Sequence, residues 1–280
     1  MANQKVVTML LPEDEPNGLK IVQLAGWVGE VLVVPRGKIS KLFERQETQQ
    51  PGIYFLFGES EDANRPFVYI GQSGNVCNRI KTQAGDKDYW DNAIIFVGGL
   101  EGGDVKYLEQ RCFEIVKSID RCDIRNFQNP EGSKLGEAKQ ISVELYLENI
   151  QFLISALGFS IFQPIPRKNS TDVFYCKAEH ADAKGALLES GEFIVYKDSI
   201  ARQRERPALY NYTKLLRKQL ESEGVIEKKD ENTLIFIRDH IFKTPSAASE
   251  VIKATPSNGW TSWVSKSGKT LNDEKRRETN

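Results

Sequence analysis

Histidine, closely spaced cysteines and long apolar runs are scarce in this chain. It holds two histidines and four cysteines in 280 residues, and no two cysteines have the C-x-x-C spacing of a zinc site. A structural zinc site is therefore not expected, and the four thiols are expected to be small buried side chains in a reducing compartment. The longest apolar runs, such as residues 152–159, fall far short of the roughly 20 residues of a membrane helix. We expect no membrane span and a cytoplasmic location.

An excess of charge of one sign is also lacking, because 38 basic residues stand against 39 acidic ones. The whole chain thus gives no electrostatic argument for nucleic acid, and any such argument must rest on a local segment. The composition, 40% hydrophobic and 28% charged residues, excludes a mainly disordered chain. A length of 280 residues predicts about two globular domains.

The apolar pattern predicts an α+β first half. Residues 1–50 are expected to be a β-rich extension. Residues 51–160 begin with two aromatic and β-branched runs separated by turn residues, a pattern typical of a β-hairpin. A helix, a third strand and two longer amphipathic helices are expected to follow, the first of the longer ones capped by Asp104. The expected ranges are 52–58 and 67–71 for the hairpin, 76–83 for the helix, 93–99 for the third strand and 142–159 for the last helix.

The second half is predicted to be a smaller α+β domain. Proline, lysine, asparagine and serine gather in residues 161–172, which is typical of a linker. New strand patterns then follow at residues 173–176, 191–197 and 233–237, with a basic helical segment before the last of them. The accessory domain is expected to span residues 173–275.

Two tripeptides of the predicted hairpin hold more glycine and tyrosine than packing requires: Gly52-Ile53-Tyr54 and Tyr69-Ile70-Gly71. Glycine at a strand end permits the close approach of another group, and tyrosine places its ring against a core and its hydroxyl at the rim. Core packing of the aromatic rings explains the tyrosines equally well. The tripeptides alone leave both interpretations open.

Two charged residues favour the functional interpretation. Arg79 lies on the helix after the hairpin and Glu109 lies on the helix after the third strand, so both can face a concavity floored by the hairpin. A carboxylate can hold a hard divalent ion, a guanidinium can neutralise charge on phosphate oxygens, and a phenol can take part in proton transfer. Together these groups are suited to phosphodiester chemistry.

At these residues the sequence resembles the GIY-YIG endonuclease family over about residues 51–130. The resemblance implies a small three-stranded mixed sheet flanked by helices and metal-dependent hydrolysis of phosphodiester bonds in nucleic acid, with DNA the expected substrate. It also implies a single Mg²⁺ or Mn²⁺ and no organic cofactor. The roles that it assigns are general base or water positioner for Tyr54, partner of that tyrosine for Tyr69, transition-state cation for Arg79, metal ligand for Glu109 and polar support for Asn126.

One departure from the family pattern concerns the base. Many relatives carry a histidine four residues after the arginine, where this chain has Gln83. An amide cannot accept a proton, so a base role there would pass to Tyr54, whose free phenol has a pKa of about 10. A nucleic-acid-binding protein with little or no cleavage therefore stays open as the alternative, and a protein-interaction module is a third interpretation.

The second half resembles the DUF4357 domain, chiefly in residues 185–199 and 244–271. That resemblance implies an architecture and little mechanism. Within this half, residues 197–218 hold seven basic and two acidic residues, with Tyr210 and Tyr212 between them. Such a segment suits a phosphate backbone, and a solvated helix face explains it equally well. The residues that we expect to contact nucleic acid are Arg202, Arg204, Arg206, Lys214, Arg217 and Lys218.

Overall fold

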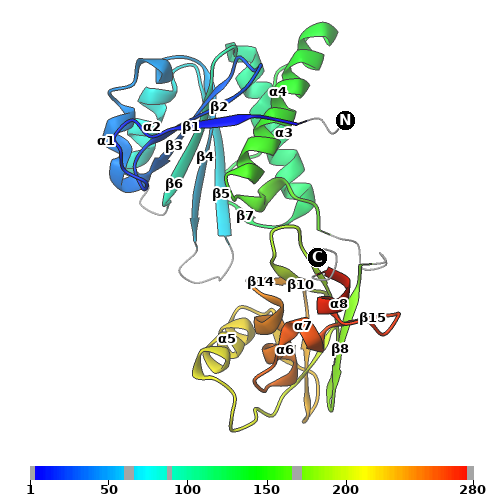
Figure 1. Cartoon of the computed structure of the whole chain (residues 1–280). Helices are drawn as coiled ribbons and strands as arrows, with labels where there is room; N and C mark the ends of the chain where they lie inside the picture. Colours follow the sequence, from blue (N-terminus) through cyan, green and yellow to red (C-terminus); the bar gives the residue numbers. More distant parts are fainter. Residues whose placement is uncertain (1–3, 60–65, 87–89, 166–171, 276–280) are drawn as a thin grey trace. The chain divides into compact units, whose positions relative to one another are not determined.

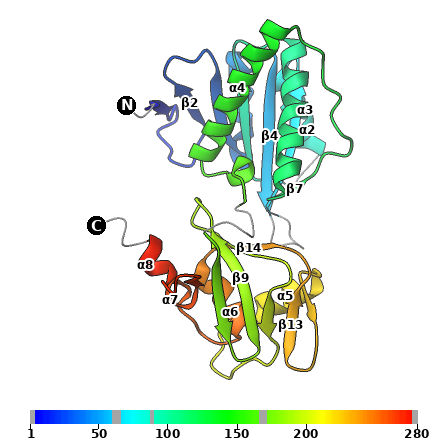
Figure 2. The same ribbon diagram turned by 90° about the vertical axis from the view of Figure 1, so that its right-hand side faces the viewer.

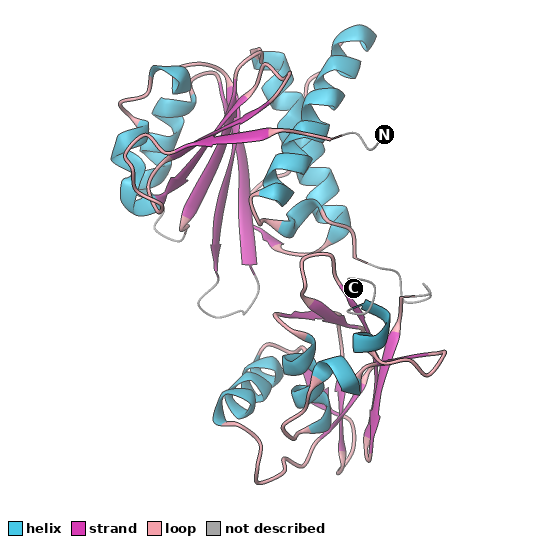
Figure 3. Cartoon of the chain, in the orientation of Figure 1, coloured by secondary structure: helices cyan, strands magenta, loops and turns pink. Residues whose placement is uncertain are grey.

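The computed structural model describes residues 4–59, 66–86, 90–165 and 172–275 (Figure 1). The chain divides into two compact units, Met1–Gln163 and Pro164–Asn280, and each of them combines helices with a sheet (Figure 3). Most of the predicted hairpin loop, residues 60–65, and half of the predicted linker, residues 166–171, lie outside the described residues. None of the described helices is long and apolar enough to cross a membrane.

One seven-stranded mixed sheet forms the framework of the first unit, with the strand order β1-β2-β3-β6-β4-β5-β7. Neighbouring strands are antiparallel except β5 and β7, which are parallel. The pairing of β4 with β5 confirms the predicted hairpin. The strands are β1 (Val7–Leu10), β2 (Lys20–Leu24), β3 (Glu30–Pro35), β4 (Gly52–Glu59), β5 (Pro66–Ser73), β6 (Asn92–Val97) and β7 (Asp123–Ile124).

The sheet is wider than the three strands that we expected. Strand β6 pairs with β4 on one side and with β3 on the other, so the strands of residues 1–50 continue the same sheet. The burial of β3 gives the reason, because Val31 and Val33 belong to the core on one face while Leu32 and Val34 belong to the core on the other. A strand that is buried on both faces takes an internal position in a sheet.

Helices cover both faces of this sheet (Figures 1 and 2). Strand β4 alternates between two cores: Ile53 and Phe55 pack with α3 and α4, while Tyr54 and Leu56 pack on the side of α1 and α2. The helices are α1 (Ile39–Leu42), α2 (Val76–Asp86), α3 (Gly102–Ile119) and α4 (Glu137–Ala156), with short 3₁₀ turns η1 (Arg36–Lys38), η2 (Gln46–Thr48) and η3 (Ser160–Phe162).

Two predicted boundaries need correction. The N-cap of α3 is Glu101, and Asp104 is the third helical residue, whose carboxylate accepts a hydrogen bond from the Glu101 backbone N–H at 2.9 Å. The glycines at 102 and 103 join the first turn because this reciprocal capping box holds it. Ile161 and Phe162, which fall within the predicted linker, are buried in the core beside α3 and α4.

The second unit is built on an antiparallel sheet with the order β12-β13-β11-β9-β10-β14, where β8 pairs with β9 and β15. The three predicted strands are found as β8, β10 and β13. The strands are β8 (Phe174–Ala178), β9 (Ala181–Leu187), β10 (Phe193–Val195), β11 (Ile200–Arg202), β12 (Ile226–Lys228), β13 (Thr233–Phe236), β14 (His240–Phe242) and β15 (Val264–Ser265). The helices are α5 (Asn211–Ser222), α6 (Pro245–Lys253), α7 (Gly259–Ser262) and α8 (Leu271–Lys275).

A buried cation, Arg217 of α5, ties together three segments of the second unit. Its guanidinium donates hydrogen bonds to the carbonyl oxygen of Val251 in α6 and to those of Arg202 and Gln203, the latter two at 2.6 and 3.1 Å. The side chain is 3% exposed, and its Nε lies 3.4 Å from Glu205. Arg217 therefore cannot contact nucleic acid from this position, which corrects the expectation for that residue.

The first prediction concerns this cation. Replacing Arg217 by Met should lower the free energy of unfolding by about 2–4 kcal/mol, because three carbonyl oxygens lose their donor and Glu205 loses its counter-charge. The control is Lys218→Met, which removes the adjacent, exposed cation and should change stability by less than about 0.5 kcal/mol. Urea denaturation monitored by circular dichroism measures both variants. Equal stability of the two would mean that the Arg217 network contributes nothing.

Candidate active site

Tyr54 and Tyr69 lie side by side on the face of the sheet that packs against α2. Tyr54 of β4 stands opposite Gly71 of β5, and Tyr69 is two residues away from Gly71 along the same strand. Their rings are stacked with centroids 6.1 Å apart and an angle of 29° between planes. Tyr54 is fully buried, whereas Tyr69 is partly exposed. The hairpin thus presents two phenols from neighbouring strands.

The two glycines of the tripeptides are required by close contacts. A Cβ atom added to Gly71 would lie 2.4 Å from Cζ and Oη of Tyr54, so the tyrosine ring lies directly over the bare backbone of β5. A Cβ atom added to Gly52 would lie 2.5 Å from the carbonyl oxygen of Phe96 and 2.7 Å from a methyl group of Val76. Gly52 therefore permits the start of α2 to pack against the sheet. The glycines position the first tyrosine and the helix that follows.

Arg79 joins the two tyrosines from the first turns of α2. Its Nε donates to the Tyr54 hydroxyl at 3.3 Å, and its guanidinium also hydrogen-bonds with the Tyr69 hydroxyl. The start of the helix is fixed by Asn75, whose side-chain oxygen accepts from the backbone N–H of Asn78 at 3.1 Å. Arg79 is exposed, so part of its guanidinium is accessible to a ligand.

The environment of Tyr54 raises the pKa of its phenol. Burial is the main cause and the neighbouring Tyr69 adds to it, while the hydrogen bond and positive charge of Arg79 oppose the change. The phenol is consequently protonated at neutral pH. In this form its hydroxyl can donate a hydrogen bond to a water or phosphate oxygen.

The outer edge of β5 brings in Glu109 and Asn126. Strand β7 pairs with β5 only at Phe67 and Val68, so the next outward-facing backbone groups of β5 need other partners. The Asn126 side chain accepts from the N–H of Ile70 at 3.1 Å and donates to its carbonyl oxygen at 2.7 Å. Further along, the backbone N–H of Gln72 lowers the pKa of the Glu109 carboxyl group, which places that group near the same edge of β5. The Asn126 side chain therefore continues the hydrogen bonding of the sheet where β7 ends.

Glu109 is partly buried on α3, and its carboxyl group is a weaker acid than usual. Burial raises the pKa of its carboxyl group to about 7, and the backbone N–H of Gln72 and the charge of Arg79 act in the opposite direction. The influence of Arg79 places the carboxylate and the guanidinium in one electrostatic neighbourhood. The structure thus brings together Tyr54, Tyr69 and Arg79, with Glu109 near enough to Arg79 for its charge to act on the carboxyl group. Asn126 lies at the outer edge of β5, beside Ile70.

Gln83, one turn after Arg79 on α2, is 4% exposed. Its side-chain oxygen is buried and has no hydrogen-bond partner among the described residues. In the sequence, Gln83 stands out only because it occupies the position of a histidine that could act as a base. The structure adds a buried hydrogen-bond acceptor without a donor, a feature that no local sequence pattern signals.

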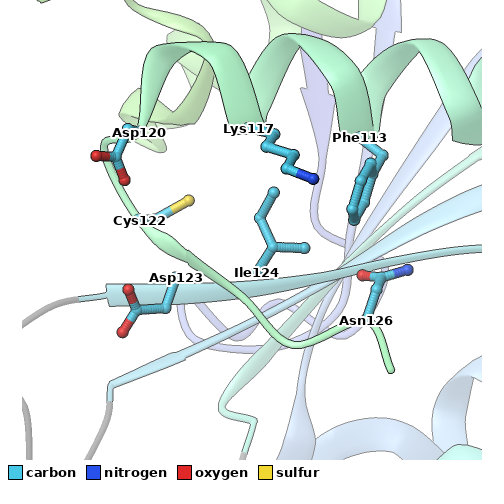
Figure 4. Close-up of a pocket in the computed structure, with 7 residues that line it drawn as sticks. All are labelled: Phe113, Lys117, Asp120, Cys122, Asp123, Ile124 and Asn126. Atoms are coloured by element: carbon cyan, nitrogen blue, oxygen red, sulfur yellow. The ribbon is translucent and has the colours of Figure 1, made fainter. Parts of the chain in front are cut away.

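A pocket of about 460 Å³ opens next to Asn126 (Figure 4). Lys117 and Phe113 reach into it from α3, opposite Ile124 and Asn126. Asp120, Cys122 and Asp123 complete its lining. Asn126 is the one residue shared with the predicted site, so this pocket flanks the tyrosine, arginine and glutamate cluster and does not contain it.

The predicted basic segment of the second unit is partly occupied by its own ion pairs. Arg202 lies 2.9 Å from Glu179, and Arg206 lies 3.9 Å from the same carboxylate. Arg204 and Lys218 are exposed, and Lys214 is partly exposed. With Arg217 buried, the residues that remain accessible are Arg204, Arg206, Lys214 and Lys218.

Comparison with known proteins bears on the second unit alone. Residues 174–275 match the model of a domain of unknown function, DUF4357. The match agrees with the resemblance of the second half and covers most of the second unit. No GIY-YIG family model matches the first unit. No curated protein and no solved structure matches the chain.

The second prediction tests the contact between Tyr54 and Gly71. Gly71→Ala should lower the free energy of unfolding by about 1–3 kcal/mol, because the new methyl group overlaps the Tyr54 ring and forces it away. Gly74→Ala is the control, since a Cβ atom there meets nothing within 4 Å. Thermal denaturation of both variants provides the measurement. A Gly71→Ala protein as stable as the control would show that the ring can move without cost.

The third prediction follows from the acidity of Glu109. Its carboxyl pKa rises from 4.5 to about 7 on folding, so between these pH values the folded state binds more protons than the unfolded state. Stability from this group is therefore lost as the pH rises through that range. Glu109→Gln does not titrate and should gain stability over wild type between pH 4.5 and pH 8 by on the order of 1–2 kcal/mol, a value reduced for partial exposure. A constant difference between the two proteins across this range would contradict the raised pKa.

Proposed function

We propose that the first unit is a metal-dependent endonuclease of the GIY-YIG type, which hydrolyses phosphodiester bonds in nucleic acid, with DNA the expected substrate. The observation that carries the proposal is the convergence of Tyr54, Tyr69, Arg79 and Glu109 from four elements, β4, β5, α2 and α3. Two phenols contact one guanidinium, and a carboxyl group lies close enough to that guanidinium for its pKa to be lowered by the charge. Such a set of groups exceeds what packing of the hairpin requires.

Arg79 is proposed to meet the charge that develops on the phosphate group. Its contacts with the hydroxyl groups of Tyr54 and Tyr69 hold the side chain in place, and its exposure leaves donors for phosphate oxygens. A planar guanidinium can donate to two oxygens at once. A cation held in this way is preorganised for the transition state.

Tyr54 is proposed to position water or a phosphate oxygen. Of the two roles that the family resemblance implies, general base requires the phenolate, and the raised pKa of this phenol disfavours that form. The protonated hydroxyl can still orient a water molecule through its hydrogen bonds. Tyr69 supports the arrangement through its contacts with Tyr54 and Arg79.

Glu109 is proposed to hold a single Mg²⁺ or Mn²⁺. Among the described residues no three acidic, histidine or cysteine side chains form a metal cluster, so the protein would supply one carboxylate. This donor set fits Mg²⁺, which keeps several waters and uses one or two carboxylates together with substrate phosphates. When bound, such an ion supplies charge neutralisation at the phosphate and lowers the pKa of water.

The second candidate is a nucleic-acid-binding protein with little or no cleavage. It is favoured by two observations: Gln83 is buried where many GIY-YIG proteins have a histidine, and the raised pKa of the Tyr54 phenol keeps it protonated. The site then lacks an evident general base other than Glu109. Cleavage assays separate the two candidates.

The fourth prediction tests cleavage and the role of Arg79. Wild-type protein should cleave supercoiled plasmid, single-stranded DNA or RNA with Mg²⁺ or Mn²⁺ and not with EDTA. Arg79→Lys should slow single-turnover cleavage by about 10²–10³, because an ammonium group cannot make the bidentate contact with the transition state. Substrate binding, measured in EDTA, should change little.

The control for this prediction is Lys81→Arg, which makes the reverse exchange of cations at an exposed position of the same helix. It should cleave like wild type. A loss of less than about threefold in Arg79→Lys would assign Arg79 to the support of α2. No cleavage of any substrate by wild type under either metal would favour the second candidate.

A further inference from the structure

The exposed large apolar side chains of the second unit gather at the start of α5. In the described part of that unit they are Tyr210, Tyr212 and Leu215, which are 50%, 56% and 68% exposed. Tyr212 and Leu215 are three residues apart on one helix and so are surface neighbours. We call these three residues the tyrosine patch. Clustering of this kind marks binding sites more often than scattered exposed residues do.

The two tyrosine rings of the patch are stacked on each other, and the Tyr212 ring is anchored by a hydrogen bond. Their centroids are 5.6 Å apart and their planes differ by 13°. The Tyr212 hydroxyl donates to a carboxylate oxygen of Glu250 in α6. This Glu250 oxygen also accepts from the Thr213 hydroxyl at 2.8 Å. Glu250 is 5% exposed, so the anchor belongs to the interior of the unit. A ligand that stacks on Tyr212 would remove little side-chain entropy on binding, because that ring is already ordered.

The charge around the patch is positive. Residues 202–218 contain six basic residues and one acidic residue, Glu205, and the Glu205 carboxylate lies 3.4 Å from the buried Arg217. Lys214 follows Tyr210 by one helical turn, and Lys218 follows Lys214 by another, so both extend from the patch along α5. The aromatic surface is therefore continued by two cations, one partly exposed and one exposed.

We infer that the tyrosine patch binds single-stranded nucleic acid, with bases stacked on Tyr210 and Tyr212 and phosphates beside Lys214 and Lys218. Aromatic rings next to a cationic track form the usual platform for unpaired bases. A duplex keeps the faces of its bases stacked on one another and cannot use the rings in this way. The inference rests on the proposed function only for the class of ligand, nucleic acid.

The fifth prediction measures binding by the full chain in EDTA, where cleavage is not required. The probe is a fluorescent oligothymidylate of about 12 nucleotides, within the site size of common single-strand platforms. Replacing both Tyr210 and Tyr212 by Ala should raise the Kd at least tenfold, since stacking of each base contributes about 1–3 kcal/mol. Replacing both by Phe keeps the rings and should change the Kd by less than about threefold.

A matched control removes exposed apolar side chains elsewhere. Ile141→Ala with Leu145→Ala truncates two residues of α4 that are 59% and 57% exposed, and this protein should bind like wild type. Replacing both Lys214 and Lys218 by Ala should flatten the slope of log K against log salt by about 1 to 1.5, whereas the tyrosine variants should leave that slope unchanged. Thermal denaturation confirms that each variant is folded.

Four results would overturn the inference. Two concern the oligothymidylate alone: wild type does not bind it in EDTA, or its Kd is unchanged when both tyrosines are replaced by Ala. The other two are an equal loss of affinity in the Phe and Ala variants, and an equal loss of affinity of the Ala variant for a duplex of the same length. Tighter binding of an oligouridylate than of the oligothymidylate would support it and identify RNA as the preferred strand. Because binding is measured without a divalent ion, its failure is distinct from a failure of cleavage. A protein that cleaves DNA and ignores the tyrosine substitutions would keep the proposed function and lose this inference.

Discussion

The hydrogen bonding along the outer edge of β5 is the constraint on which the candidate site depends. Strand β7 pairs with β5 only at Phe67 and Val68, near the start of β5. The outward-facing backbone groups of Ile70 and Gln72 therefore need other hydrogen-bond partners. Asn126 supplies both partners of Ile70, and the Glu109 carboxyl group lies near the backbone N–H of Gln72. Because Asn126 completes the edge of the sheet at Ile70, its side chain is held beside the hairpin whether or not a substrate is present.

Close steric contacts position Tyr54 and the start of α2, on the other side of the site. The ring of Tyr54 needs the bare backbone of Gly71, and the start of α2 needs the bare backbone of Gly52. Arg79 then lies within reach of both phenols. One tripeptide thus positions the ring and the helix, while the other provides the surface beneath the ring. The chemistry proposed for the site relies on both glycines as much as on the tyrosines.

Local features of the first unit could be predicted from the sequence, and distant pairings could not. The aromatic and β-branched runs at residues 52–58 and 67–71, with turn residues between them, predicted the hairpin, and three- and four-residue spacing predicted α3. The joining of β3 to β6 could not be foreseen, because it pairs residues about sixty positions apart. Arg217 was expected at the surface since composition carries no information on burial, and its partners are main-chain oxygens of distant segments. The proximity of Glu109 to Arg79 follows from how α3 packs on β5, which no local pattern encodes.

The anchor made by Arg217 has a consequence for how the second unit can evolve. Its hydrogen bonds go to backbone carbonyl oxygens of Val251, Arg202 and Gln203, and every amino acid carries such an oxygen. Mutation of the side chains at those positions leaves the acceptors in place. The segment that leads into α5 can therefore change its surface residues, while its path is preserved by a partner that does not depend on them.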